Sequence, residues 1–236
     1  MEELGGLPLL GSQPGGNWDS DAYSFEDLFI SCWHITSSSP ILYVYFSKDI
    51  VGNEERVQLS IDNPTFPVPV YYYLEGRDSN IFSAYKTYLQ ELFQAFGANE
   101  TTATEYSKGI VNLEIDLVNI SSYVNKDYNR AVPIKKLNKF GDKIDLKKIV
   151  KGILQHGELS TKSSDVVNLS GVRYINSIYK VLNNYPKRMV ASYLLSRAVI
   201  TELSFLPQIY TNINKKFEKF CFRVVSVIAV FTVHHR

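Results

Sequence analysis

The feature that most constrains this chain is a helical apolar period that begins near residue 80. Two successive stretches carry it: first Phe82, Tyr85, Tyr88, Leu89, Leu92, Phe93 and Phe96, then Tyr106, Ile110, Leu113, Leu117 and Ile120. Because these side chains recur every three or four residues, each set lies on one face of a helix. Gly97 is a predicted stop for the first helix, and Thr102 with Glu105 forms a capping-box pattern at the start of the second. Two amphipathic helices are therefore expected.

Further helical segments are expected in the second half of the chain. The apolar pattern predicts helices over about 145–155, 172–184, 186–206 and 207–220, with a short extended stretch at 165–169. Gly157 follows the end of the first of these, and Pro186 suits the first turn of the third because that turn needs no backbone N–H. The sequence thus predicts a mostly α protein.

The region before residue 62 has a different period. Residues 41–46 are rich in β-branched and aromatic side chains, and in 56–61 Val57, Leu59 and Ile61 alternate with polar residues. Gly52 and Asn53 form a polar connection between the two stretches. We therefore expect a multi-helical lobe with one small β-hairpin near the N-terminus.

Composition divides the chain into three parts. Residues 1–24 are rich in Gly, Pro and Ser and are expected to be a loop-rich segment, 25–221 form the helical domain, and 222–236 are an apolar tail of a different character. The longest apolar run, 224–233, is about half of the roughly 20 residues that a membrane span needs. The acidic start Met1-Glu2-Glu3 is followed by no apolar stretch. Neither a signal peptide nor a membrane anchor is therefore expected in this chain.

The charge balance argues against a general polyanion-binding function. The 236 residues carry a formal net charge of +1, which gives no overall attraction to nucleic acid or anionic membranes. Lysines nevertheless cluster at positions 135, 136, 139, 143, 147, 148 and 151, around an amphipathic helix. Such a segment could contact lipid or nucleic acid. The interpretation we favour is the solvated face of a core-packed helix, without a nucleic-acid partner.

Histidine and cysteine patterns offer no catalytic constellation. His34 lies two residues from Cys32, but no third group is evident to orient a base, so a packing role is expected for both. His156 stands near a helix end and suits a cap. His234 and His235 could bind metal only weakly, because adjacent histidines rarely form a site on one element. None of the four histidines begins a His-Glu-x-x-His motif, so we predict no catalytic, cofactor-binding or metal-ligating residue.

Three N-glycosylation sequons occur, at Asn99, Asn119 and Asn168. They matter only if the chain is exported, because the modification belongs to the secretory pathway. The two cysteines, Cys32 and Cys221, neither demand nor rule out a disulfide.

Short segments along about 200 residues resemble the amino-terminal part of the ectodomain in the neprilysin and endothelin-converting enzyme family of zinc metallopeptidases. The resembling segments are 4–8, 43–49, 61–74, 113–121, 166–175, 193–197 and 220–221. Two departures stand out. Leu7 replaces a tryptophan of the family, and the paired cysteines that the family has after its Tyr-Tyr segment are missing around 76–84. After Cys221 the resemblance stops.

The resemblance implies a peptidase part without its catalytic part. In the family zinc and the general base come from a His-Glu-x-x-His segment farther along the chain, and no position here matches it. It thus implies a non-catalytic cap domain, inactive alone, whose partner is a catalytic lobe and whose parent acts on peptides outside the cell. It also makes Cys221 a candidate for a disulfide in a full-length parent, and it aligns Asn119 with a family sequon. The alternative is a free-standing helical module that binds a peptide or protein.

Overall fold

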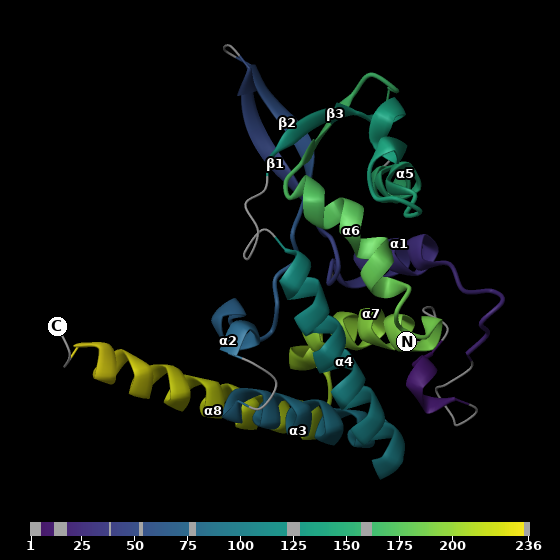
Figure 1. Cartoon of the computed structure of the whole chain (residues 1–236). Helices are drawn as coiled ribbons and strands as arrows, with labels where there is room; N and C mark the ends of the chain where they lie inside the picture. The colour runs from purple at the N-terminus through teal and green to yellow at the C-terminus, as the bar shows by residue number, and fades with distance from the viewer. Residues whose placement is uncertain are drawn as a thin grey trace.

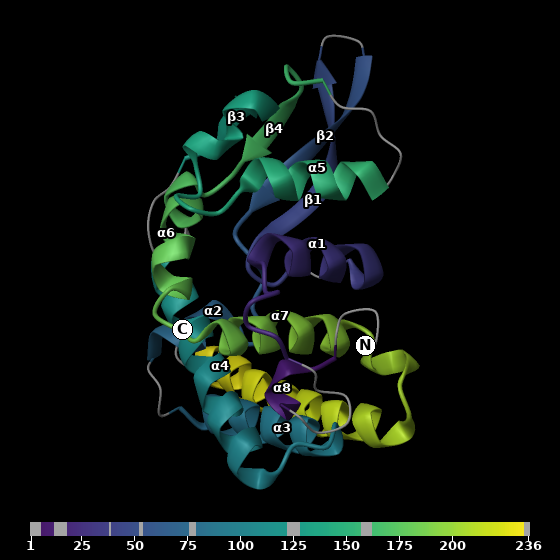
Figure 2. The same ribbon diagram turned by 90° about the vertical axis from the view of Figure 1, so that its right-hand side faces the viewer.

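The computed structural model describes residues 6–11, 18–37, 39–51, 54–75, 79–121, 128–156 and 162–233, with only the backbone described for 49–51, 54–56, 75, 156 and 222–233. Figure 1 shows a sheet at one end of the molecule, helices stacked below it, and the last helix extending to one side at the other end. Figure 2 shows that helices cover one face of the sheet. The predicted connection at Gly52 and Asn53 and the predicted stop at Gly157 lie outside the described residues.

Two long helices form the base, where the apolar period predicted them. They are α3 (Asn80–Ala95) and α4 (Glu100–Ile120), and their striped side chains are buried against each other and the rest of the core. Gly97, at φ +104°, follows α3 as predicted. The capping prediction for α4 was wrong. Asn99 is the cap, because its side-chain oxygen accepts from the Thr102 backbone N–H at 2.9 Å, and the helix begins at Glu100.

The central helix is α7 (Lys187–Thr201), which is buried around most of its circumference and so shows little amphipathic pattern. It packs against α1 (Phe25–Thr36), whose first turn is capped by the Ser24 side chain. Helix α8 (Gln208–Val233) packs along α3, where the Phe217 ring stacks on Tyr88 with centroids 4.8 Å apart. The predicted helix over 186–206 is wrong in its last turn, which is the short 3-10 helix η4 (Leu203–Phe205).

The predicted hairpin is confirmed as β1 (Tyr43–Val51) paired antiparallel with β2 (Glu54–Asp62). Two further short strands, β3 (Arg130–Pro133) and β4 (Val166–Leu169), extend it into a four-stranded sheet. Its order is β1-β2-β4-β3, with β2 and β4 parallel. Val44, Leu59, Ile61, Val167 and Leu169 are buried on the face that the helices cover.

The remaining elements complete the core. They are η2 (Pro8–Leu10), α2 (Val70–Glu75), η3 (Ile134–Lys139), α5 (Leu146–His156) and α6 (Val172–Leu182). The helices expected over 145–155 and 172–184 are thus present, within two residues at each end. The N-terminal segment contributes more than a loop, because Leu7, Leu9 and Leu10 are buried. Within the part of the chain that the structure describes, no helix combines the length and the apolar character that crossing a membrane requires.

Candidate functional site

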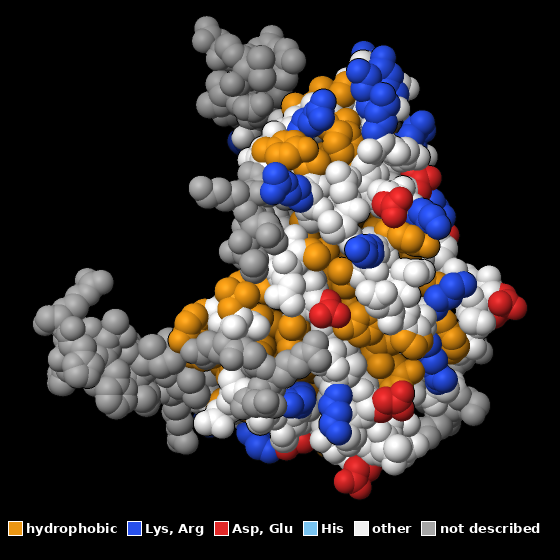
Figure 3. All heavy atoms as spheres, viewed as in Figure 1, with side chains coloured by type: hydrophobic (Ala, Val, Ile, Leu, Met, Phe, Trp, Pro, Cys, Tyr) orange, Lys and Arg blue, Asp and Glu red, His pale blue; other side chains and the backbone are white. Residues whose placement is uncertain are grey.

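The candidate site is the hollow side of the molecule, on the left in Figure 1. The hairpin bounds it above, α8 bounds it below, and α2 lies between them. In the space-filling view hydrophobic side chains gather at the position of α2, where the outline of the molecule turns inward (Figure 3). This side lies opposite the helices α1 and α5, which cover the sheet from the right.

Helix α2 presents two apolar side chains outward. Tyr71 is 58% exposed and Leu74 is 53% exposed, whereas the intervening Tyr72 and Tyr73 are buried. The Tyr72 ring packs edge-on against Tyr71 with centroids 5.3 Å apart. Two large exposed apolar side chains on one turn of a helix cost free energy in water and suit a surface that another element covers.

Tyr73 anchors α2 to the core through a buried carboxylate. Its hydroxyl donates to Glu114 Oε2 at 2.8 Å, and the Tyr85 hydroxyl donates to Glu114 Oε1 at 3.1 Å. Glu114 is on α4 and is fully buried. Hydrogen bonds to charged groups contribute about 1.5–3 kcal/mol each. These two bonds therefore fix the position of α2, and with it the direction of Tyr71 and Leu74.

A buried arginine provides the opposite charge. Arg197 Nη1 on α7 lies 3.8 Å from Glu114 Oε1, within ion-pair distance but without a hydrogen bond among the described residues. Burial raises the pKa of Glu114, while Arg197 and the surrounding tyrosine hydroxyls act in the opposite direction. One carboxylate thus connects α2, α3, α4 and α7. Its signal in the sequence is an acidic residue on the same helical face as Ile110 and Leu117, which we did not use.

The sheet face away from the helices carries mainly polar side chains. Tyr43, Tyr45 and Ser47 alternate with the core residues of β1, and Gln58, Ser60 and Asn168 lie on the same face of β2 and β4. The Tyr43 and Tyr45 rings stack with centroids 4.9 Å apart, and Tyr43 is 42% exposed. Hydroxyl and amide groups on a strand face can exchange hydrogen bonds with a polar chain lying beside them.

The cysteine and histidine near the N-terminus have packing roles, as predicted. Cys32 is a fully buried free thiol, and burial raises its pKa to about 12, so it is a poor nucleophile. The His34 Nε2 atom makes a hydrogen bond with the Gly152 carbonyl at 3.1 Å, joining α1 to α5. His156 is the last residue of α5, with its side chain outside the description, and His234 and His235 lie outside the described residues.

Neither a metal nor a disulfide site is formed by the residues in the described ranges. They contain no group of three His, Cys, Asp or Glu side chains arranged to hold a metal ion. Cys221 is a half-buried free thiol on α8.

The three sequon asparagines occupy different environments. Asn99 and Asn119 are exposed at the two ends of α4. Asn168 is half-buried in β4, where its side-chain nitrogen donates to Gln58 Oε1 at 3.2 Å. Glycosylation of these asparagines stays a prediction.

Comparison with known proteins identifies the family. The model of the amino-terminal region of peptidase family M13 matches residues 1–224. The chain belongs to peptidase family M13. It is similar to Neprilysin-21 of Caenorhabditis elegans, with 26% identity over 215 residues that cover 87% of this chain and 27% of the relative. It is also similar to Neprilysin-2 of Drosophila melanogaster, with 23% identity over 215 residues, covering 88% of this chain and 27% of that protein.

Other relatives agree with this assignment. Endothelin-converting enzyme-like 1 of Mus musculus is 26% identical over 214 residues, covering 85% of this chain and 26% of the relative. The fold resembles the cryo-EM structure of the Mycobacterium tuberculosis zinc metalloprotease ZMP1 in its open state, with a TM-score of 0.66 at 12% identity, over 84% of this chain and 31% of that one. This chain therefore corresponds to the amino-terminal domain of an M13 peptidase and spans about a quarter of the length of its relatives.

Proposed function

We propose that this chain is the non-catalytic cap of a neprilysin-like zinc metalloendopeptidase that acts on peptides outside the cell. The observation that carries the proposal is the outward pair Tyr71 and Leu74 on α2, held in position by the buried Tyr73–Glu114 hydrogen bond. In the proposal, these side chains are covered by a catalytic lobe, and the polar sheet face forms part of the wall around an enclosed peptide.

Catalysis is assigned to the other lobe. Hydrolysis by a zinc peptidase needs a metal-bound water and a general base beside it. The sequence contains no His-Glu-x-x-His motif, and within the described ranges no three His, Cys, Asp or Glu side chains are grouped to hold a metal ion. The residues of this chain would therefore bind, enclose and orient a peptide without taking part in proton transfer.

Activity of the purified 236-residue chain tests the catalytic half of the proposal. The chain is incubated with Zn²⁺ and a set of internally quenched peptides, with a neprilysin as positive control. We expect no hydrolysis above the rate without protein. Hydrolysis that follows the protein through purification and is abolished by a zinc chelator would overturn the proposal.

The second part of the proposal, that another lobe covers Tyr71 and Leu74, is tested by surface variants. The isolated chain should self-associate through α2, and Tyr71→Ser with Leu74→Ser should shift it towards monomer in sedimentation velocity. The matched control is Phe205→Ser with Ile209→Ser, because these side chains are also exposed, at 84% and 57%, but lie on η4 and α8. Equal effects of both double variants would argue against α2 as the docking face. If the unmodified 236-residue chain is a monomer and binds peptides, the alternative of a free-standing binding module is favoured.

A further inference from the structure

One surface of the molecule has a strong charge that the proposed cap function does not use. Between residues 130 and 151 there are eight basic residues and only two acidic ones, Asp142 and Asp145. Because the whole chain has a net charge of only +1, the remaining residues are net negative. The charge is therefore concentrated on η3 and α5, where Figure 3 shows the Lys and Arg side chains gathered at the upper right of the molecule.

Within the described part of the chain, these cations are not neutralised by neighbouring carboxylates. We define the basic face as Lys135, Lys136, Lys139, Lys143, Lys147 and Lys151. Among the described residues no carboxylate is within ion-pair distance of any of these six. Lys148 differs, because its Nζ atom lies 2.7 Å from Asp27 Oδ2. Asp145 is also occupied, since its carboxylate accepts from the Lys148 backbone N–H at 2.8 Å.

A groove adjoins the basic face. It has a volume of about 840 Å³ between α1 and α5. Its charged lining consists of Lys147, Lys148 and Lys151 with the carboxylates Asp27 and Asp145, and the amides Asn138 and Gln155 lie beside them. Lys147 and Lys151 are four residues apart and so lie on one side of α5. Since Asp27 is paired with Lys148, Lys147 and Lys151 are the groove cations left to meet an anion, and together with the exposed lysines of η3 they suit an extended anionic chain better than a compact ligand.

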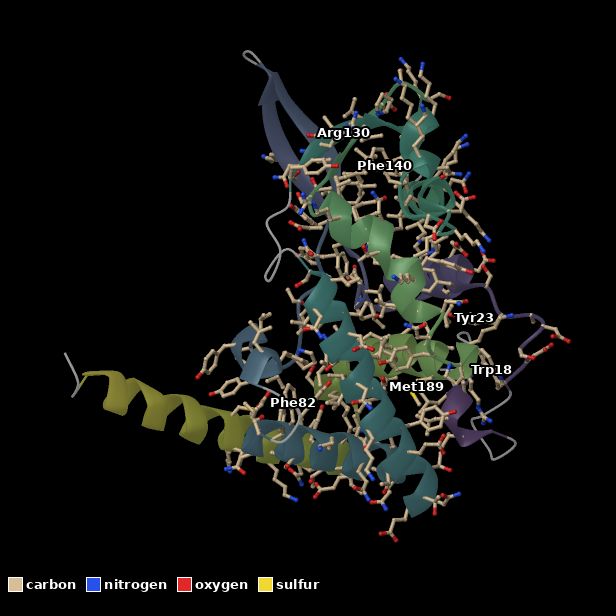
Figure 4. The ribbon with its side chains drawn as sticks, viewed as in Figure 1. Trp18, Tyr23, Phe82, Arg130, Phe140 and Met189 are labelled. Carbon is tan, nitrogen blue, oxygen red and sulfur yellow. The ribbon has the colours of Figure 1, made fainter. Side chains whose placement is uncertain are left out.

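The chemistry of the basic face distinguishes among three polyanions: a nucleic acid, an anionic membrane and an acidic polysaccharide. The Phe140 ring has the Arg130 guanidinium 5.6 Å from its centroid (Figure 4), and the Tyr179 ring has Lys143 Nζ at 5.1 Å. A cation therefore occupies one face of each ring, which makes these rings poor platforms for the stacking of bases. Leu146, Ile149 and Val150 of α5 are fully buried, so they cannot insert into a bilayer as the apolar side of a surface helix would.

We propose that the basic face binds a sulfated polysaccharide. Lysines act as point charges that match sulfate groups by charge density, without the planar hydrogen-bond forks that read base edges. The choice of a polysaccharide over other polyanions rests on the extracellular location proposed above, but binding itself does not require that the chain is a peptidase cap.

Heparin is the probe for this proposal, using the full chain at a series of salt concentrations. The logarithm of the binding constant should fall linearly with the logarithm of the salt concentration. The variant Lys135→Gln/Lys136→Gln/Lys139→Gln should lower the salt slope by about one per lysine removed, the value known for phosphate contacts. Its affinity at 0.15 M salt should fall roughly tenfold or more.

The matched control removes three exposed lysines from other helices, Lys108, Lys187 and Lys215, as glutamines. We expect its salt slope and affinity to stay close to those of the unmodified chain, and melting temperatures to be equal in all three proteins. Equal losses in the two triple variants, or no heparin binding at 0.15 M salt, would overturn the proposal. So would equally strong binding to a DNA duplex or to phosphatidylserine vesicles. Absence of peptidase activity has no bearing on these outcomes.

Discussion

Arg197 and Glu114 form an ion pair in the core whose two closest atoms are 3.8 Å apart, and the carboxylate takes its hydrogen bonds from tyrosines instead. The charge of the arginine and the hydroxyls of Tyr73 and Tyr85 therefore stabilise the same ion from different directions. A buried charge that loses one such partner keeps its desolvation cost, so this cluster should be sensitive to single substitutions.

Glu114→Gln and Arg197→Met should each lower the free energy of unfolding by about 3 kcal/mol, because each leaves the opposite charge buried without compensation. The double variant should lose less than the sum of the two, with a coupling of about 1–2 kcal/mol. Urea unfolding of the four proteins measures this cycle.

The control cycle is Lys148 with Asp27, whose atoms are closer, at 2.7 Å, but whose side chains are 43% and 62% exposed. Solvent screening should limit this pair to less than about 1 kcal/mol. A larger coupling at the surface than in the core would contradict our account of the Glu114 cluster.

Stability should fall on the alkaline side. Burial raises the pKa of Cys32 from 9.0 to about 12 and the pKa values of Tyr73 and Tyr85 well above 10. A group whose pKa is raised by folding contributes full stability below its unfolded pKa and loses it as the pH rises towards the folded value. The free energy of unfolding should thus begin to fall near pH 9, by up to about 1.4 kcal/mol per pH unit for each such group, and the melting temperature should fall with it.

Thermal melts between pH 7 and 11 measure this decline. Cys32→Ala should be less stable at neutral pH because it leaves a cavity, yet its decline between pH 9 and 10 should be shallower. If the melting temperature of the unmodified chain stays constant to pH 11, these groups ionise without loss of stability and the prediction is wrong.

When the chain is produced through a secretory pathway, we expect glycans on Asn99 and Asn119 but not on Asn168. The first two are exposed, and a glycan on the Asn99 side-chain nitrogen leaves the oxygen free to cap α4. Asn168 donates that nitrogen to Gln58 within the sheet. Glycopeptide mass spectrometry reads all three sites. Thr101→Ala removes the first sequon without changing the cap, and a fully occupied Asn168 would contradict the prediction.

Deleting residues 222–236 should raise the soluble yield, because the run 224–233 is apolar and uncharged. The truncated chain keeps the contacts of Phe217 with Tyr85 and Tyr88. Truncation after Leu206 is the control, since it removes α8 and uncovers those tyrosines, and it should lower the yield. An unchanged or lower yield from the first deletion would mean that the tail packs on the fold.

The parts of the fold that sequence reasoning predicted are those with a strong local period. The helices bearing Phe82–Phe96 and Tyr106–Ile120 have apolar side chains on one face, and the hairpin strand with Val57, Leu59 and Ile61 alternates. Helix α1 was missed, although Ser24 followed by Glu26 and Asp27 is a helix-start signal. Strand β3 could not be found, because four residues that pair only with β4 have no readable period.

The candidate site was less predictable than the fold. Tyr71, Tyr72 and Tyr73 are identical in type, and Tyr73 is held inward by its bond to Glu114, 41 positions away, and by ring contacts with Phe82. Such a long-range hydrogen bond leaves no mark in the local pattern. The resemblance to the peptidase family led to the proposed function, whereas the exposed pair Tyr71 and Leu74 became visible only in the structure.

The pairing of β2 with β4 has a consequence for how the protein is made. Leu59 and Val167 are neighbours in the sheet but 108 positions apart in the sequence. On the ribosome the hairpin is therefore complete long before the strand that shields its edge has been synthesised. Helices α3 and α4, whose contacts are local, can form in that interval, whereas the sheet closes late because long-range pairing is slow. The newly made hairpin edge is thus the segment that a chaperone has most reason to protect.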